Sequence, residues 1–152
     1  MVPLRNGLEV EIRRLEPADR ADWERLFRGY IAFYERTIED AEYERAWTRL
    51  LADREIHGRA AIVDGELVGI THFLCHAHTN SADVCYLQDL FTDPDARGQG
   101  IGRALIDEVT QWANREGCSR VYWLTQTHNA RARRLYDQVA DERGFVVYQI
   151  ML

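Results

Sequence analysis

The feature that most constrains this chain is a set of three glycines at alternate positions, Gly98, Gly100 and Gly102, in the stretch FTDPDARGQGIGRALIDEV. A helical pattern of apolar side chains follows directly, running from Ile101 to Trp112. Glycine inside a helix is less favourable than alanine by about 1 kcal/mol. Three glycines where a helix begins therefore predict that the backbone there approaches another group closely, without side chains in between.

That group is predicted to be an anion. The first N–H groups of a helix have no partner within the helix, and the helix dipole adds partial positive charge at this end. Such an end suits phosphate. Arg97 and Arg103 flank the stretch, and arginine binds phosphate through paired hydrogen bonds. A tight glycine turn without a ligand is the alternative that these residues leave open.

Two familiar phosphate motifs do not fit. The Walker pattern is absent because no Gly-Lys-Ser/Thr occurs in the chain. The dinucleotide fingerprint GxGxxG also fails, because the third glycine comes one residue early and position 103 is arginine. A nucleotide-binding module therefore stays only as a distant alternative.

Composition indicates one globular domain spanning residues 1–152, with 46% hydrophobic residues. The net charge of −6 argues against nucleic acid or an anionic membrane as the main partner. No apolar run approaches the roughly 20 residues of a membrane helix. The N-terminal stretch lacks the apolar core of a signal peptide, and Cys75, Cys85 and Cys118 form no CxxC pair. We therefore expect a cytoplasmic protein with reduced thiols.

Hydrophobic periodicity predicts a mixed α/β fold with the order β-α-α-β-β-β-α-β-α-β. An Asp64-Gly65 hairpin signal lies between two apolar runs. A strand–helix–strand unit from Val84 to Thr125 implies one parallel pair in an otherwise antiparallel sheet. Strands are expected at 8–13, 59–63, 66–74, 84–92, 119–126 and 145–152, and helices over 23–34, 43–51, 101–112 and 129–144.

The stretch ARGQGIGRALI resembles the pyrophosphate loop of the GNAT N-acetyltransferases, whose pattern is Gln/Arg-x-x-Gly-x-Gly/Ala. Arg97, Gly100 and Gly102 occupy its places. The stretches CYLQDLFTDP, RVYWLTQTHN and ARRLYDQVADERGFVVY extend the resemblance over nearly the whole chain, to the bacterial branch related to the yeast histone and polyamine acetyltransferases. The resemblance implies the GNAT fold, with its two parallel strands splayed apart around the cofactor.

The cofactor that this resemblance implies is acetyl-CoA. The strand end at 90–92 would bond its pantetheine arm through the backbone, and the glycine loop would hold its pyrophosphate, with Arg131 or Arg134 also close to the phosphates. The C-terminal region is often used for dimer contacts in the family, so a homodimer is expected. The expected cofactor contacts are Leu90, Phe91, Thr92, Arg97, Gly98, Gln99, Gly100, Ile101, Gly102, Arg103, Asn129 and Tyr136.

Catalysis in the family is direct attack of an amine on the thioester, and the resemblance gives roles to three positions. Tyr136 would protonate the leaving thiolate, Asn129 would orient the pantetheine, and a backbone N–H near Leu90 would stabilise the carbonyl oxygen. Each side chain has an alternative role, because Tyr136 also lies on an apolar helical stripe and Asn129 also suits a helix N-cap.

The general base is not evident from the sequence. In a regular strand Tyr86, Gln88 and Leu90 share a face, and none of them is a carboxylate. Asp89 lies on the other face unless a β-bulge turns it. Asp89 is therefore the candidate base, and a water chain to a more distant carboxylate is the alternative.

The acceptor pocket is expected beside the first helices. Tyr30 and Tyr34 lie one helical turn apart, and Gln88 and Trp123 could complete the substrate site. Packing of these aromatic side chains in the core is the alternative. No metal site is expected at the nearby histidines, because His72 and His76 would be about 13 Å apart along a strand.

These observations predict an acetyl-CoA-dependent N-acetyltransferase that acts on a primary amine. A small polyamine-like or amino-acid-like amine is the first candidate, and a protein lysine is the second. The alternative is an acyl-CoA-binding or regulatory domain with weak catalysis, which the missing obvious base favours.

Overall fold

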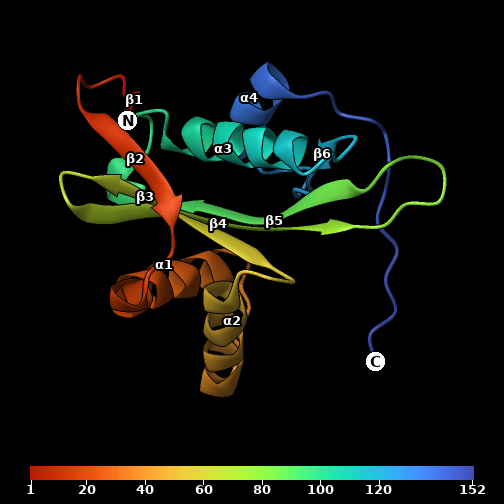
Figure 1. Ribbon diagram of the computed structural model, residues 1–152, viewed down its shortest axis with the longest axis horizontal. Coiled ribbons are helices and arrows are strands. Elements are labelled where there is room, and N and C mark those ends of the chain that lie inside the picture. Colours follow the sequence, from red (N-terminus) through yellow and green to blue (C-terminus); the bar gives the residue numbers. More distant parts are fainter.

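The computed structural model describes residues 1–152 as one mixed α/β domain built on a six-stranded sheet (Figure 1). The strands follow one another across the sheet in chain order, antiparallel except for a parallel pair at the last two. This arrangement confirms the predicted mixed sheet. The strands are β1 (Val2–Pro3), β2 (Glu9–Arg14), β3 (His57–Val63), β4 (Glu66–His76), β5 (Val84–Thr92) and β6 (Val121–Tyr122).

Two pairs of helices cover the two faces of the sheet. Figure 1 shows the first pair on one side and the second pair on the other. None of the four has the length and apolar character that a membrane-spanning helix requires. The helices are α1 (Arg20–Phe33), α2 (Asp40–Ala52), α3 (Ile101–Arg115) and α4 (Ala130–Val139), with short 3₁₀ turns at Pro17–Asp19 and Pro94–Ala96.

Each face of the sheet has its own apolar core. Trp23 of α1 and Trp47 of α2 pack with their ring centroids 5.0 Å apart, over Ile70 of β4. On the other face Phe73 of β4 packs edge-on against Trp112 of α3. The apolar stripes that predicted these helices are therefore the surfaces that the sheet buries.

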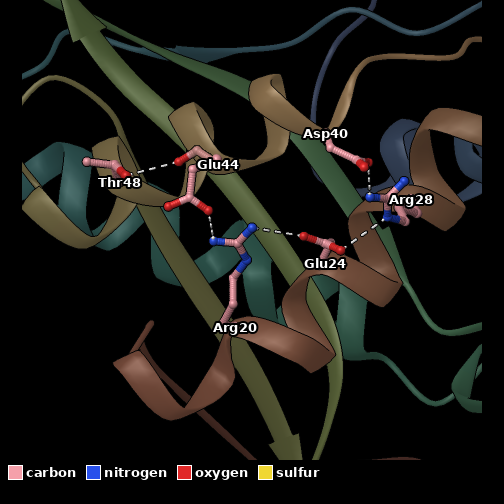
Figure 2. A network of polar contacts seen from close by, with 6 residues as sticks. All are labelled: Arg20, Glu24, Arg28, Asp40, Glu44 and Thr48. Carbon is pink, nitrogen blue, oxygen red and sulfur yellow. Dashed lines mark hydrogen bonds and ion pairs between the residues drawn. The ribbon is translucent and has the colours of Figure 1, made fainter.

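An ionic network joins α1 to α2 at the surface (Figure 2). Glu24 lies between two arginines of α1, 3.0 Å from Arg20 and 3.2 Å from Arg28. Arg20 reaches Glu44 at 2.7 Å, and Arg28 reaches Asp40 at 2.7 Å. Exposed pairs of this kind contribute little to stability, so the network mainly fixes how the two helices lie relative to each other.

A β-bulge in β5 decides which side chains face α1. Phe73 pairs with Leu87 while the preceding His72 pairs with Asp89, so Gln88 is an extra residue in β5. Leu87 packs against α3, whereas Phe91 packs against the core under α1. The bulge therefore turns Asp89 to the α1 face. Such a bulge is the condition that the sequence sets for Asp89 to act as the base.

The C-terminal prediction is wrong in three respects. Strand β6 pairs over Val121–Tyr122 alone instead of 119–126, and α4 ends at Val139, well before Gly144. Residues 145–152 form no strand, and their apolar side chains are exposed. Their sequence has strong β character, but a strand needs a neighbouring edge to pair with. This segment runs past the end of the sheet instead (Figure 1).

The cysteines also differ from the expectation of three reduced thiols. Cys75 at the end of β4 and Cys118, between α3 and β6, form a disulfide between positions 43 apart in the sequence. Cys85 is the free thiol and is fully buried in β5. Burial raises the pKa of Cys85 to about 11, so its thiol stays protonated and unreactive at neutral pH.

Gly69 of β4 allows α3 to pack closely on the sheet. A Cβ at this position would lie 3.0 Å from the Ile101 side chain and 3.2 Å from Leu105. We predict that Gly69→Val lowers the free energy of unfolding by about 1–3 kcal/mol, because the extra carbons overpack this contact. Urea unfolding followed by tryptophan fluorescence measures the change.

The control for this prediction is Arg20→Ala in the surface network, which should cost less than about 1 kcal/mol. An unfolding midpoint for Gly69→Val equal to that of the unmodified protein would show that α3 shifts to accommodate the side chain.

Candidate functional site

A cavity of about 480 Å³ opens where β5 has lost its pairing with β6. Its walls come from the end of α1, the end of β5, the glycine loop, the start of α3 and one side of α4. All of the predicted cofactor residues line it except Gln99. Segments far apart in the sequence are thus brought together as predicted.

The glycines of the loop answer different needs. Gly98 and Gly100 have φ angles of 81° and 101°, a backbone region that favours glycine, and a Cβ on either would meet no neighbouring atom. They line the cavity, so their bare backbone borders open space. Gly102 is helical, and a Cβ there would lie 3.2 Å from Leu135 of α4. It therefore serves close packing of α3 against α4.

Helix α3 presents its free N–H groups to this cavity. The first backbone bond of the helix runs from the Ala104 N–H to the Gly100 carbonyl at 3.0 Å. The N–H groups of residues 101–103 precede it and have no partner within the helix. All three residues line the cavity. The predicted anion site is thus formed by backbone donors together with the positive end of the helix dipole.

The charge of the lining is entirely positive. It contains Arg5, Arg97, Arg103, Arg131 and Arg134 but no aspartate or glutamate, although the whole chain carries a net charge of −6. Burial and then the positive charge of Arg131 lower the pKa of Arg97 below its ordinary value. A bound polyanion would relieve this repulsion. The lining therefore fits a ligand that carries several phosphates.

Arg5 is the phosphate-side residue that the sequence did not reveal. Its backbone N–H donates to the Gln99 carbonyl at 3.1 Å, which holds the N-terminal segment against the glycine loop. Gln99 thus contributes a backbone contact rather than a side chain to the cavity. No local pattern around Arg5 signals this position, because only the folded chain brings it there.

The edge of β5 is free beside the cavity. Strand β6 pairs with β5 only at Cys85 and Tyr86, so the edge from Leu90 to Thr92 has no neighbouring strand on that side. The Thr92 carbonyl accepts a hydrogen bond from Arg97 Nε at 3.2 Å. An extended ligand arm can lie along such an edge and bond to its backbone.

Helix α4 brings Asn129 and Tyr136 to the opposite wall. Asn129 caps the helix through Ala132 N–H, and it also lines the cavity, so both predicted roles remain compatible. Burial raises the pKa of Tyr136 to about 12, so its phenol keeps its proton at neutral pH. Trp123 packs against the Tyr136 ring at 5.3 Å and does not line the cavity, contrary to its predicted place in the substrate site.

Tyr30 and Tyr34 form the other end of the cavity, with ring centroids 5.0 Å apart. Tyr30 also packs on the core under α1, so both interpretations of its ring hold. Burial raises the pKa of Tyr30 and Tyr34 above the ordinary value, and the negative charge of Asp89 raises both further. Gln88 is exposed and lies outside the cavity lining, because it is the bulge residue.

Asp89 lies just behind these tyrosines. Its side chain is 13% exposed, and its Oδ2 is 2.8 Å from Nδ1 of His72. His76, the other histidine of β4, contacts the Tyr122 hydroxyl at 2.8 Å. His72 and His76 therefore hydrogen-bond to different partners.

Comparison with known proteins agrees with this geometry. Residues 21–140 match the model of the acetyltransferase (GNAT) family. The chain belongs to this family. As a GNAT acetyltransferase it uses acetyl-CoA as its acyl donor, and the arginine-rich, carboxylate-free lining fits the phosphates of that molecule.

Several curated proteins are similar over most of their length. A D-amino-acid N-acetyltransferase of Saccharomyces cerevisiae is 30% identical, covering 92% of this chain and 89% of the relative. An aminoglycoside N(6')-acetyltransferase of Stenotrophomonas maltophilia is 34% identical, covering 90% of each chain. These relatives are named N-acetyltransferases, and their named substrates differ.

Solved structures show the same fold. The aminoglycoside N-acetyltransferase AAC(6')-Iy, in complex with coenzyme A, superposes with a TM-score of 0.84 at 20% identity, covering 95% of this chain and 96% of the other. A ribosomal-protein-alanine N-acetyltransferase from Brucella melitensis gives a TM-score of 0.79 at 26% identity, covering 95% and 100%. The mixed sheet with its parted strands is thus the GNAT fold.

Gly100 offers a test of the loop. We predict that Gly100→Ala weakens coenzyme A binding at least about tenfold, because a Cβ strains the positive φ and intrudes where the backbone meets the ligand. Isothermal titration calorimetry measures the affinity. Gly117, after α3, has a φ of 79° and equally open surroundings.

Gly117→Ala is therefore the matched control. It should lower stability to a similar degree while the affinity for coenzyme A stays unchanged. Equal affinities for both variants would show that the loop backbone does not contact the cofactor.

Proposed function

We propose that this protein transfers the acetyl group of acetyl-CoA directly to the primary amine of a small molecule. The observation that carries the proposal is that one cavity joins an all-arginine anion site to a tyrosine end backed by Asp89. An anionic donor and a cationic acceptor would thus meet head to head inside it.

The donor end positions the cofactor. The N–H groups at the start of α3, with Arg97 and Arg103, would hold the pyrophosphate. The free edge of β5 from Leu90 to Thr92 would bond the pantetheine arm, which Asn129 orients from the opposite wall. A backbone N–H near Leu90 would stabilise the carbonyl oxygen. Bound acetyl-CoA supplies a thioester carbonyl that an amine can attack.

The acceptor end manages the protons. An ammonium substrate gives one proton to the Asp89 carboxylate and becomes a nucleophilic amine. The nitrogen then bonds to the acetyl carbon as the carbon–sulfur bond breaks, and the Tyr136 phenol protonates the departing sulfur. The product nitrogen gives its remaining extra proton to the tyrosinate, and Asp89 returns its own to solvent. The sum is one amide, one thiol and one released proton.

The shape of the acceptor end favours a small amine. Tyr30 and Tyr34 offer ring faces for a cation next to Asp89. An adjoining cavity of about 610 Å³, which shares Tyr34 and Arg131 and includes Glu35, gives room for the rest of the molecule. A polyamine-like or amino-acid-like amine fits best, and the names of the yeast and Stenotrophomonas relatives support this class. A protein lysine is the second candidate.

Replacing Tyr136 by phenylalanine separates an enzyme from a domain that only binds acyl-CoA. We predict that Tyr136→Phe lowers kcat between about 100- and 10,000-fold, because it removes the acid that protonates the thiolate. The dissociation constant for acetyl-CoA should stay within a factor of about two. Thiol release with a panel of amines measures kcat, and calorimetry measures binding.

A matched control is Tyr122→Phe, which removes a phenol that contacts His76 outside the cavity. Binding of acetyl-CoA without thiol release for any amine by the unmodified protein would favour the regulatory domain instead.

The exposed C-terminal segment supports a homodimer. Phe145 and Tyr148 are 89% and 92% exposed, and both faces of residues 145–152 are apolar apart from Gln149. A strand with two apolar faces is typical of the interior of a buried sheet. We infer that this segment pairs with the unpaired edge of β6 in a second copy, which would bury both.

We predict that the unmodified protein is a dimer by size-exclusion chromatography with light scattering. The double substitution Val147→Lys with Ile150→Lys should convert it to a monomer, because each lysine would place a charge on a different face of the buried strand. Gln149→Lys alone is the milder control. A monomeric unmodified protein at micromolar concentration would refute the inference.

A further inference from the structure

A buried chain of hydrogen bonds leads from the core to the acceptor end of the cavity. The indole Nε1–H of Trp23 donates to Nε2 of His72 at 2.9 Å, and Nδ1 of His72 contacts Oδ2 of Asp89 at 2.8 Å. Trp23 is fully buried and His72 is 2% exposed. Trp23, His72 and Asp89 all lie outside the cavity lining, and Asp89 is the member of this chain that lies against Tyr30 at the cavity wall.

The partners fix the position of the proton on His72. An indole nitrogen only donates, so Nε2 of His72 must be the acceptor and carries no proton. The neutral ring then holds its proton on Nδ1, from which it donates to Asp89. In a doubly protonated ring, the Nε2–H of His72 would face the Nε1–H of Trp23, and two donors cannot form a hydrogen bond. The tautomer is thus determined by Trp23, and the direction of the bond to Asp89 follows from it.

The backbone around Asp89 is held as well. The Thr71 hydroxyl donates to the Asp89 carbonyl at 2.8 Å, and Thr71 is fully buried. Of the two carboxylate oxygens, Oδ2 is bonded to His72. The negative charge of Asp89 helps to raise the pKa of Tyr30, Tyr34 and Tyr86, so three protonated phenols surround it.

Two aromatic rings pack against His72. Phe27 packs edge-on against the imidazole with centroids 4.9 Å apart, and Trp23 lies at 6.1 Å. No charged group besides Asp89 hydrogen-bonds to this histidine. A buried imidazole with fixed partners and one donor aimed at a carboxylate can hold that carboxylate in one orientation.

We propose that Trp23 and His72 are positioning residues that hold Asp89 toward the acceptor amine. His72 occupies Oδ2 of Asp89 with a neutral N–H, which fixes the rotamer of Asp89 without neutralising it and holds the carboxylate against Tyr30 at the cavity wall. This inference rests on the proposed function, because it concerns the residue that receives the amine's proton.

The test compares two substitutions at His72. His72→Leu removes the donor to Asp89, whereas the amide nitrogen of His72→Asn lies where Nδ1 does and keeps it. We expect His72→Leu to lower kcat/KM for the amine about 100-fold, the cost of misplacing a reacting group by about 1 Å. His72→Asn should recover at least about tenfold of that loss. The KM for acetyl-CoA should not change in either variant.

A double-mutant cycle with Asp89→Asn separates positioning from general stability. If His72 acts through Asp89, His72→Leu should cost nothing further in the Asp89→Asn background. Independent, multiplicative losses would overturn the proposal, as would full activity of His72→Leu.

His57→Leu is the matched control. Like His72, His57 has an aspartate partner, Asp53 at 2.6 Å, but it is only half-buried and packs on Trp112 away from the cavity. Its loss should lower the unfolding midpoint but leave kcat/KM unchanged.

Nitrogen-15 NMR of the imidazoles tests the hydrogen-bond chain from Trp23 through His72 to Asp89 without any activity measurement. The unmodified protein should show His72 as the Nδ1–H tautomer, and Trp23→Phe should release that preference. An Nε2–H tautomer would overturn the proposal. If the unmodified protein binds acetyl-CoA but acetylates no amine, the proposed function fails. The spectrum still shows whether Trp23 fixes the tautomer of His72.

Discussion

The early end of the pairing between β5 and β6 is the constraint on which the rest of the site depends. These parallel strands share pairing only at Cys85–Val121 and Tyr86–Tyr122. Beyond that point β5 continues alone to Thr92, with a free backbone edge. The chain then turns through Gly98 and Gly100 into α3, so the free N–H groups of that helix open onto the same space. A fully paired sheet would fill the place that the cofactor needs.

The bulge at Gln88 adds the second half of the arrangement. In a regular strand Asp89 would face α3 together with Leu87, where burying a carboxylate among apolar side chains is costly. One extra residue moves it to the α1 face, where His72 satisfies it and Tyr30 shields it. The same irregularity excludes Gln88 from the site. A local irregularity in strand pairing therefore determines which of two adjacent polar residues lies beside Tyr30.

What the sequence could predict follows from how local each signal is. The glycine loop, Arg97, Asn129 and Tyr136 belong to short stretches whose geometry depends on their own backbone and the adjoining helix. The position of Arg5 and the hydrogen bonds of His72 depend on contacts between elements distant in the chain, which no local periodicity encodes. The prediction of a strand at the C-terminus failed for a related reason. The β propensity of this segment is evident, but propensity does not supply the edge with which a strand must pair.

The separation of charge between the two ends of the cavity would let one small domain bind an anionic acyl donor and the cationic acceptor of the proposed function. Five arginines line the donor end, and burial and then the charge of Arg131 lower the pKa of Arg97. A single carboxylate acts on the other end, enclosed by phenols that stay protonated and therefore cannot add negative charge of their own. In the proposed reaction Asp89 would attract the amine and the arginines would attract the phosphates, although Arg131 and Arg134 also line the adjoining cavity. In the proposed reaction each substrate would be directed to one end, and the reacting carbonyl and nitrogen would meet beside Tyr136.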